Sequence, residues 1–176
     1  MTELAAVAEA QSPAPALEAV FRAIARQQMR DMPMLNPALS VEAVGFRHWR
    51  EHWLGVLVTP WFMNLVLMPR QREQWQPLAE RATRHYAFPA GVFEFIGARD
   101  AVLGDYQACS LFSPMFEFAD HAGARATALA AIGALFDPAC RESGEARASR
   151  ASSECPQAAL PPPPSNCHPG ESRDPG

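Results

Sequence analysis

Few residues of this sequence could do chemistry, and its cysteines and histidines are the first candidates. Cys109 lies in an apolar run and could form a nucleophile–base or redox pair with His121. His48 and His52 are four residues apart, a spacing that aligns two metal ligands on a helix. The run around them instead has the pattern of a strand and its turn, in which residues i and i+4 lie about 13 Å apart. We therefore expect the two histidines to face solvent near a hairpin and Cys109 to be an inert small hydrophobe.

Two acidic residues, Glu94 and Glu117, are embedded in apolar runs, VFEFI and MFEFA. Paired carboxylates suit general acid–base catalysis. Alternation along a strand instead turns Glu94 outward, and Glu117 is placed to start or cap the last helix. The sequence contains no nucleophile elbow, glycine-rich phosphate loop or Cys-x-x-Cys pair. We predict that the protein is not an enzyme and holds no metal or cofactor.

Composition argues against several other classes of protein. The chain has 176 residues, a formal net charge of −4 and a pI near 5.7. No basic patch stands out, which argues against a nucleic-acid or anionic-membrane partner. No apolar stretch approaches the roughly 20 residues that a membrane-spanning helix needs, and the N-terminus lacks the pattern of a secretory signal. We expect a soluble, cytoplasmic protein.

Hydrophobic spacing predicts the elements that must position these residues. A period of 3.6 residues predicts a helix from about Pro15 to Asp31. Strand-like runs follow at Val41–Trp49, Trp53–Thr59 and Phe62–Met68. A short polar stretch joins the first two runs as a hairpin, and Pro60 marks a junction before the third.

In the second half of the chain, the hydrophobic pattern predicts a short surface helix within residues 70–86. It then predicts an antiparallel pair of strands at Gly91–Ala98 and Gly104–Ser113. A last helix is predicted over residues 119–136, with Asp120 as its N-cap. Strands that run together between flanking helices predict an α+β fold. We expect an antiparallel sheet with an N-terminal and a C-terminal helix packed on it, both on one face.

The expected domain organisation is a flexible leader over residues 1–15, one domain over 16–137 and a disordered proline-rich tail over 138–176. The last 39 residues hold 8 of the 17 prolines and show no hydrophobic periodicity. The ending CHPGESRDPG resembles peptides read through bacterial intergenic repeats, which favours an accidental extension. A functional proline-rich ligand is the alternative.

Two segments, Thr59–Pro69 and Cys109–His121, carry more apolar side chains than a sheet with one solvent-facing side explains. A strand buried on both faces accounts for their central residues. Trp61, Phe62 and Met63 follow one proline, and Met115 and Phe116 follow another. Aromatic and methionine side chains on loops and strand ends are enriched at protein-binding patches, so pattern alone leaves core and interface open for them.

These segments, read together with MPMLNPAL, TPWFMNL and SLFSPMFEF, resemble the HybE family of nickel–iron hydrogenase assembly chaperones, from about Leu17 to Phe136. The resemblance implies a cytoplasmic accessory protein that binds hydrogenase precursors and delays their twin-arginine export until cofactor assembly is complete. Some members of this family carry a rubredoxin module with paired Cys-x-x-Cys ligands. This sequence has no such pairs, so no iron site is expected.

The expected partners are the hydrogenase small-subunit precursor with its signal peptide, the large-subunit precursor, or both. The alternative function is a metal- or redox-handling maturation factor that uses Cys109 and nearby histidines. For the chaperone function, we expect the partner to be bound by an apolar set of side chains with one amide, namely Trp61, Phe62, Met63, Asn64, Phe112, Met115 and Phe116.

Overall fold

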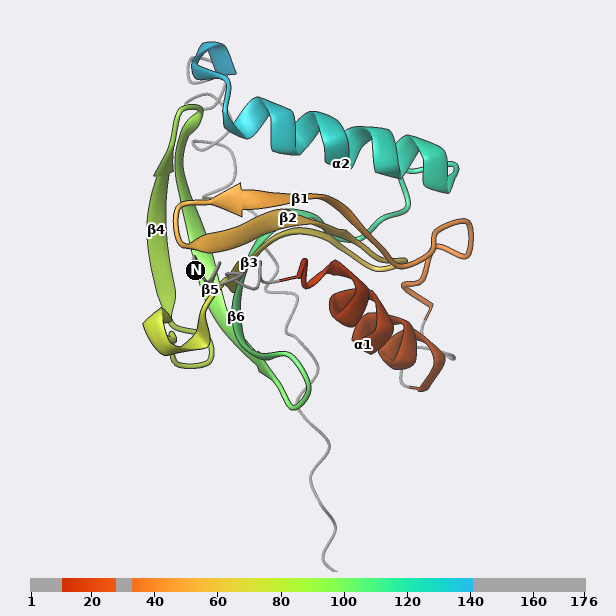
Figure 1. Cartoon of the computed structure of the whole chain (residues 1–176). Helices are drawn as coiled ribbons and strands as arrows, with labels where there is room; N and C mark the ends of the chain where they lie inside the picture. Colours follow the sequence, from red (N-terminus) through yellow and green to blue (C-terminus); the bar gives the residue numbers. More distant parts are fainter. Residues whose placement is uncertain (1–10, 28–32, 141–176) are drawn as a thin grey trace, which may run out of the picture.

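The computed structural model describes residues 11–27 and 33–140, which form two helices, six strands and two short 3-10 turns. This arrangement confirms the α+β fold (Figure 1). The strands lie in one sheet in the order β1-β2-β3-β6-β5-β4, and each neighbouring pair is antiparallel. The elements are α1 (Ala14–Gln27), β1 (Glu42–Trp49), β2 (His52–Val58), β3 (Met63–Pro69), η1 (Arg72–Gln74), β4 (Thr83–Phe88), β5 (Gly91–Asp100), β6 (Gly104–Phe112), α2 (His121–Leu135) and η2 (Pro138–Cys140).

The two helices lie on opposite faces of the sheet, so the prediction that both cover one face is wrong (Figure 1). Leu17 of α1 belongs to a core cluster with Leu57 and Val66, whereas Ile132 of α2 belongs to a second cluster with Leu65. Successive residues of a strand point to opposite faces. The central strands β2 and β3 are therefore apolar throughout because each face receives its own helix.

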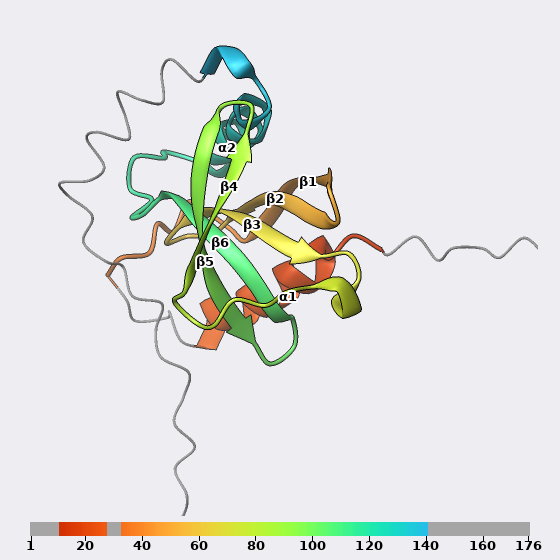
Figure 2. The same ribbon diagram turned by 90° about the vertical axis from the view of Figure 1, so that its left-hand side faces the viewer.

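The sheet curls strongly, and its two outer strands approach each other on the α2 face (Figure 2). The ring of Trp49 in β1 stacks on Phe88 of β4 with a centroid distance of 4.3 Å, and it meets Tyr86 edge-on at 5.7 Å. Contact between the two ends of the strand order makes the α2 face concave. We call it the concave face.

The predicted surface helix within residues 70–86 is wrong. The segment contains only the 3-10 turn η1, and then it enters the edge strand β4. Pro77 disfavours a continuous helix, and the alternation of Tyr86 and Phe88 toward the core fits a strand. The helical spacing of Trp75, Leu78 and Ala82 belongs to an irregular segment.

Other predicted boundaries are confirmed. The hairpin between β1 and β2 turns at Arg50, whose φ is 52°, and Pro60 separates β2 from β3. Asp120 caps α2, because its Oδ1 accepts a hydrogen bond of 2.7 Å from the backbone N–H of Gly123. The predicted end of the first helix at Asp31, most of the predicted leader and residues 141–176 of the predicted tail fall outside the described residues.

Candidate partner-binding surface

Asn36 joins three loops at one end of the sheet. Its side chain is buried, and Nδ2 donates hydrogen bonds to the carbonyl oxygens of Met115 (2.9 Å) and Phe118 (2.7 Å). The backbone N–H of Asn36 donates to the carbonyl of Pro60 at 2.9 Å, and Oδ1 accepts from the N–H of Ala38 at 3.0 Å. One asparagine thereby holds residues 33–40, 59–62 and 113–120 together.

The loop between β2 and β3 is fixed by Thr59, which is fully buried. Its hydroxyl donates to the carbonyl of Phe62 at 2.9 Å and accepts from the N–H groups of Phe62 (2.9 Å) and Trp61 (3.3 Å). The ring of Phe62 also meets Phe21 of α1 edge-on, with centroids 5.8 Å apart. Trp61 and Phe62 are thus held half-buried, with part of each side chain facing solvent.

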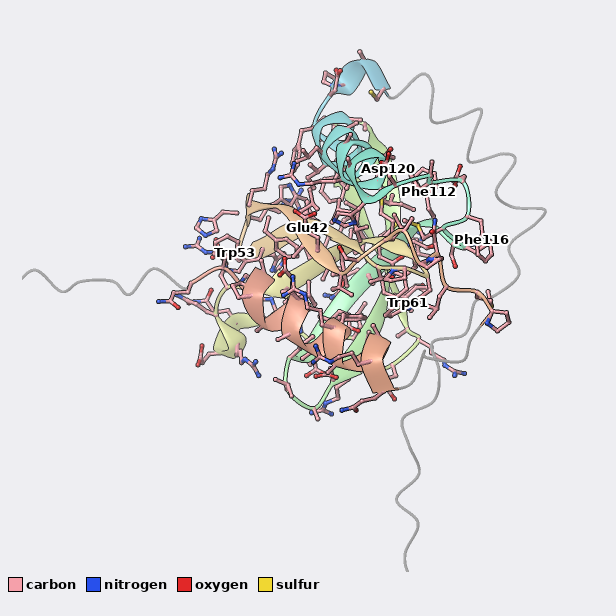
Figure 3. All side chains as sticks on the ribbon, turned by 90° about the vertical axis from the view of Figure 1, so that its right-hand side faces the viewer. Glu42, Trp53, Trp61, Phe112, Phe116 and Asp120 are labelled. Atoms are coloured by element: carbon pink, nitrogen blue, oxygen red, sulfur yellow. The ribbon has the colours of Figure 1, made fainter. Side chains whose placement is uncertain are left out.

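The loop that leads to α2 presents the most exposed aromatic side chain of this region. Phe116 is 57% exposed, while its neighbour Met115 is fully buried. Phe112 and Phe118 form an edge-to-face pair at 5.3 Å beside it, and Met34 is 46% exposed on the loop held by Asn36. Trp61, Phe112 and Phe116 lie toward the same side of the molecule (Figure 3). We define the loop-end surface as Met34, Trp61, Phe62, Phe112, Phe116 and Phe118.

Charged groups lie beside this surface at the start of α2. Glu42 of β1 accepts from Arg125 Nε at 2.9 Å and lies 2.7 Å from His121 Nε2. Burial alone would raise the pKa of Glu42, but the hydrogen bonds and charges of Arg125 and His121 lower it below its ordinary value. Glu117 and Asp120 remain exposed on the neighbouring loop. The border of the loop-end surface is therefore partly acidic.

The structure divides the predicted partner-binding residues into two groups. Met63 and Met115 have no exposed surface and support the loops from within the core. Trp61, Phe62, Phe112 and Phe116 are exposed in whole or in part. Asn64 is half-buried, and its Oδ1 has no hydrogen-bond partner among the described residues.

Asn36, Thr59 and Met34 were missed as contributors to this surface. The segment MPMLNPAL did contain a usable signal for the first of them. Asparagine before proline favours a turn, and its side chain readily bonds to nearby backbone groups. The long-range partners of Asn36, Met115 and Phe118, are 79 and 82 residues away and could not be read from that local pattern.

The candidate chemical groups are not brought together by the fold. His48 pairs across the hairpin with Trp53, and His52 pairs with Trp49, so the two histidines point to opposite faces. Burial, and secondarily the charge of Glu94, raises the pKa of Cys109 to about 11, which keeps the thiol protonated.

The remaining candidates are equally separated. The imidazole of His121 contacts Glu42 on β1, whereas Cys109 lies on β6, beyond β2 and β3. Glu94 pairs with His85 at 3.3 Å, and Glu117 is exposed on another loop. Residues 11–27 and 33–140 contain no cluster of three or more His, Cys, Asp or Glu side chains able to hold a metal ion. The geometry gives no support to a metal- or redox-handling site in this part of the chain.

Neither helix in the described part of the chain is long and apolar enough to cross a membrane.

Comparison with protein families matches residues 12–162 to the family described as NiFe-hydrogenase assembly chaperone, HybE. The chain is 48% identical over 122 residues to the hydrogenase expression/formation protein HupJ of Bradyrhizobium diazoefficiens, an alignment covering 69% of this chain and 70% of that protein. It is 44% identical over 139 residues to the probable rubredoxin HupJ of Rhodobacter capsulatus, which covers 77% of this chain but only half of that longer protein.

The same architecture is found in a solved structure. The solution structure of HybE from Escherichia coli matches with a TM-score of 0.60 and 20% sequence identity, over 92% of this chain and 91% of that chain. At this identity the likeness shows a common fold. The family match covers most of the sequence and is a match to assembly chaperones, which confirms that the protein is not an enzyme. The chain belongs to the HybE family of nickel–iron hydrogenase assembly chaperones.

Proposed function

We propose that this chaperone acts in the cytoplasm, binds a hydrogenase precursor through the loop-end surface and delays its export until the cofactors are assembled. The small-subunit precursor with its twin-arginine signal peptide is the first candidate partner, and the large-subunit precursor is the second. The observation that carries the proposal is the exposed Phe116 among half-buried aromatic side chains on loops that Asn36 holds in place. A surface already fixed before binding loses less conformational entropy when a partner docks.

The charge around the surface supports a basic, apolar partner. Glu117 follows Phe116 directly, Asp120 is nearby on the same loop, and the whole chain has a net charge of −4. A twin-arginine signal peptide combines a basic start with an apolar segment. Acidic groups at the border would speed its association, and the aromatic side chains would bury its apolar part.

The test is retention of radiolabelled precursors on the immobilised full chain. The small-subunit precursor should be retained, and deletion of its signal peptide should abolish retention. Retention of the large-subunit precursor alone would identify that precursor as the partner. Retention of neither precursor would contradict the proposal.

Phe116→Ala tests the surface itself. Truncating an exposed side chain should leave the melting temperature nearly unchanged, while precursor binding should weaken roughly tenfold or more if Phe116 is a central contact. Val92→Ala is the matched control, because Val92 is 67% exposed on β5, outside the three joined loops. Equal effects of the two substitutions on binding would remove Phe116 from the binding site.

A further inference from the structure

A second surface surrounds the turn between β1 and β2, at the far end of β2 from the loop-end surface. Strand β2 runs from His52, at this turn, to Val58, which leads into the loop fixed by Thr59. The turn lies beside β4 (Figure 1), and Trp53 lies on the opposite side of Figure 3 from Phe116. This second surface is therefore separate from the proposed precursor site.

Four arginines from three separate parts of the sequence surround the turn. Arg47 and Arg50 belong to the hairpin of β1 and β2, and Arg84 belongs to β4. Arg70 directly follows β3, and its backbone N–H donates to the carbonyl of Glu51 in the turn at 3.3 Å. The fold thereby assembles a basic patch that no single stretch of the sequence shows.

Aromatic contacts place Arg84 close to Arg50. Arg84 lies two residues from Tyr86 on the same face of β4. The ring of Tyr86 meets the rings of Trp49 and His52 edge-on, with centroid distances of 5.7 and 6.4 Å. Burial lowers the pKa of His52, and the charges of Arg50 and Arg84 lower it further. Both guanidinium groups therefore lie within electrostatic range of the same imidazole ring.

None of these four arginines forms an ion pair with a carboxylate of the described residues. The arginine–carboxylate pairs of the described chain lie elsewhere, at Arg22, Arg99 and Arg125. Glu51 is the only acidic residue in the three segments that meet here, which are residues 47–53, 68–70 and 83–88. The positive charge of this patch is therefore largely uncompensated.

Aromatic rings hold two of the guanidinium groups by their flat faces. Cζ of Arg50 lies 4.6 Å from the ring centroid of Trp49, and Cζ of Arg47 lies 5.1 Å from that of Phe136. Trp49 is itself stacked on Phe88, whose ring meets Phe136 edge-on at 6.0 Å. Stacking occupies the face of a guanidinium group and leaves the N–H donors along its edge free. Both arginine side chains are exposed, so these donors are available to a partner.

We propose that this hairpin-end surface, formed by Arg47, Arg50, Arg70 and Arg84, binds an acidic segment of a protein through its carboxylate groups. The fork of N–H donors on each guanidinium group matches a carboxylate and can donate two parallel hydrogen bonds to it. Two guanidinium groups fixed on different rings suit separate carboxylates of one acidic segment. Those carboxylates would also reduce the repulsion among the four arginines.

Other anionic partners fit the hairpin-end surface less well. Single-stranded nucleic acids stack their bases on free aromatic faces, but Trp49 is already stacked on Phe88 and covered by Arg50. Binding to a membrane surface uses exposed apolar side chains that enter the lipid. The large apolar side chains that are exposed in the described chain all lie outside the three segments that meet here. The net charge of −4 also repels an extended polyanion at long range.

The experiment is an NMR titration of the isotope-labelled full chain with acetylated hexaglutamate amide. Saturable shifts are expected at the backbone N–H groups of residues 47–52 and at the indole N–H of Trp49. Added NaCl should weaken this binding because it screens exposed charges. Acetylated hexaserine amide is the uncharged control and should give no saturable shifts. Hexaglutamate binding no tighter than hexaserine binding would overturn the proposal.

Substitutions of the exposed arginines test the surface without disturbing the core. Arg50→Gln should weaken hexaglutamate binding roughly two- to fivefold, and Arg47→Gln combined with Arg50→Gln roughly tenfold, as expected for exposed ion pairs. Arg26→Gln is the matched control, because Arg26 is exposed near the end of α1 and its loss changes the net charge equally. Equal weakening by Arg26→Gln and Arg50→Gln would mean that only net charge matters, which would contradict a defined surface.

Two further probes distinguish the other anionic partners. Single-stranded hexathymidylate represents nucleic acid, and vesicles of phosphatidylcholine and phosphatidylserine represent an anionic membrane. Both should bind more weakly than hexaglutamate, and tighter binding of either would replace the acidic protein segment by that partner. Precursor retention at the loop-end surface is measured separately, so this proposal and the proposed function can fail independently.

Discussion

Asn36 is the residue on which the geometry of the loop-end surface depends. Its side-chain amide donates hydrogen bonds, in place of water, to two carbonyl groups of a loop about 80 residues further along the chain. Buried carbonyl groups must be paired, and no helix or strand supplies the partner here. The exposed position of Phe116 and the buried position of Met115 follow from the path that this pairing gives to the loop.

We expect Asn36→Ala to lower the free energy of unfolding by about 2–3 kcal/mol, because the carbonyl of Phe118 loses its side-chain donor and the carbonyl of Met115 keeps only the 3.3 Å hydrogen bond from the N–H of Phe118. Asn64→Ala is the control, since Asn64 Oδ1 has no partner among the described residues to lose, and should cost about 1 kcal/mol or less. Urea unfolding of both variants measures the difference. Precursor retention should also fall in Asn36→Ala at temperatures where it stays folded. Equal costs for the two substitutions would contradict the role of Asn36.

Below neutral pH, the dependence of stability on pH has two identifiable sources. The pKa of Glu42 is lowered in the folded protein, so its contribution is present above the ordinary value of 4.5 and is lost as pH falls through the lower, folded value. Burial lowers the pKa of His52 below 6.5. As pH falls below 6.5, the unfolded state takes up this proton more readily, and stability declines.

We therefore expect the free energy of unfolding to fall in two stages as the pH is lowered from 7 to 3. His52→Phe should flatten the stage that begins as the pH falls below 6.5, and Glu42→Gln the stage below about pH 4.5. Urea unfolding at closely spaced pH values distinguishes them. A stage that persists in its own variant would assign it to another group.

Close packing between neighbouring strands limits the size of some side chains, and the sequence pattern does not reveal which ones. Gly55 lies in β2 between Val44–Arg47 of β1 and Val66 of β3. A Cβ at this position would run into the ring of Phe46. The glycine leaves room for that ring to lie on the sheet beside α1.

Gly55→Ala should consequently destabilise the protein by about 1–3 kcal/mol through overpacking, although alanine is the smallest possible addition. Gly133→Ala is the control, because a Cβ there meets nothing within 4 Å and alanine favours the helix. Thermal unfolding should show a lower Tm for the first variant and an equal or higher Tm for the second. A Gly55→Ala protein as stable as the parent would mean that Phe46 relaxes without cost.

Local pattern predicted the elements with a strong period and missed those defined by long-range contacts. The runs of β2, β3, β5 and β6 were visible because their apolar residues are continuous or alternate cleanly. Strand β4 was missed because its preceding segment carries an accidental helical spacing at Trp75, Leu78 and Ala82. The placement of helices on opposite faces depends on how the sheet curls, which no local window contains.

The loop-end surface could likewise be predicted only in part from the sequence pattern. Apolar excess at Thr59–Pro69 and Cys109–His121 correctly marked two of the three segments that meet at the loop-end surface. It did not separate Met63 and Met115, which are buried, from Phe116, which is exposed. That difference arises from hydrogen bonds between loops distant in sequence.

For the whole molecule, the two core clusters share one sheet and should unfold together. Val56 and Leu57 are neighbours in β2, yet they contribute to different clusters on the two faces. Disrupting either face therefore disturbs the strand that supports the other. One cooperative transition is the expected behaviour for a domain of this size.

The last prediction concerns residues 141–176. The buried apolar residues of the described chain run from Leu17 to Leu135, so truncation after Cys140 should leave the urea midpoint and precursor retention unchanged. Truncation after Ala130 is the destabilised control, because it removes Ile132 and Leu135 from the core. The family match extends to residue 162, which makes truncation after Pro162 the informative intermediate. If the protein shortened to Cys140 loses binding and the one shortened to Pro162 retains it, residues 141–162 take part in function and the accidental extension begins only after them.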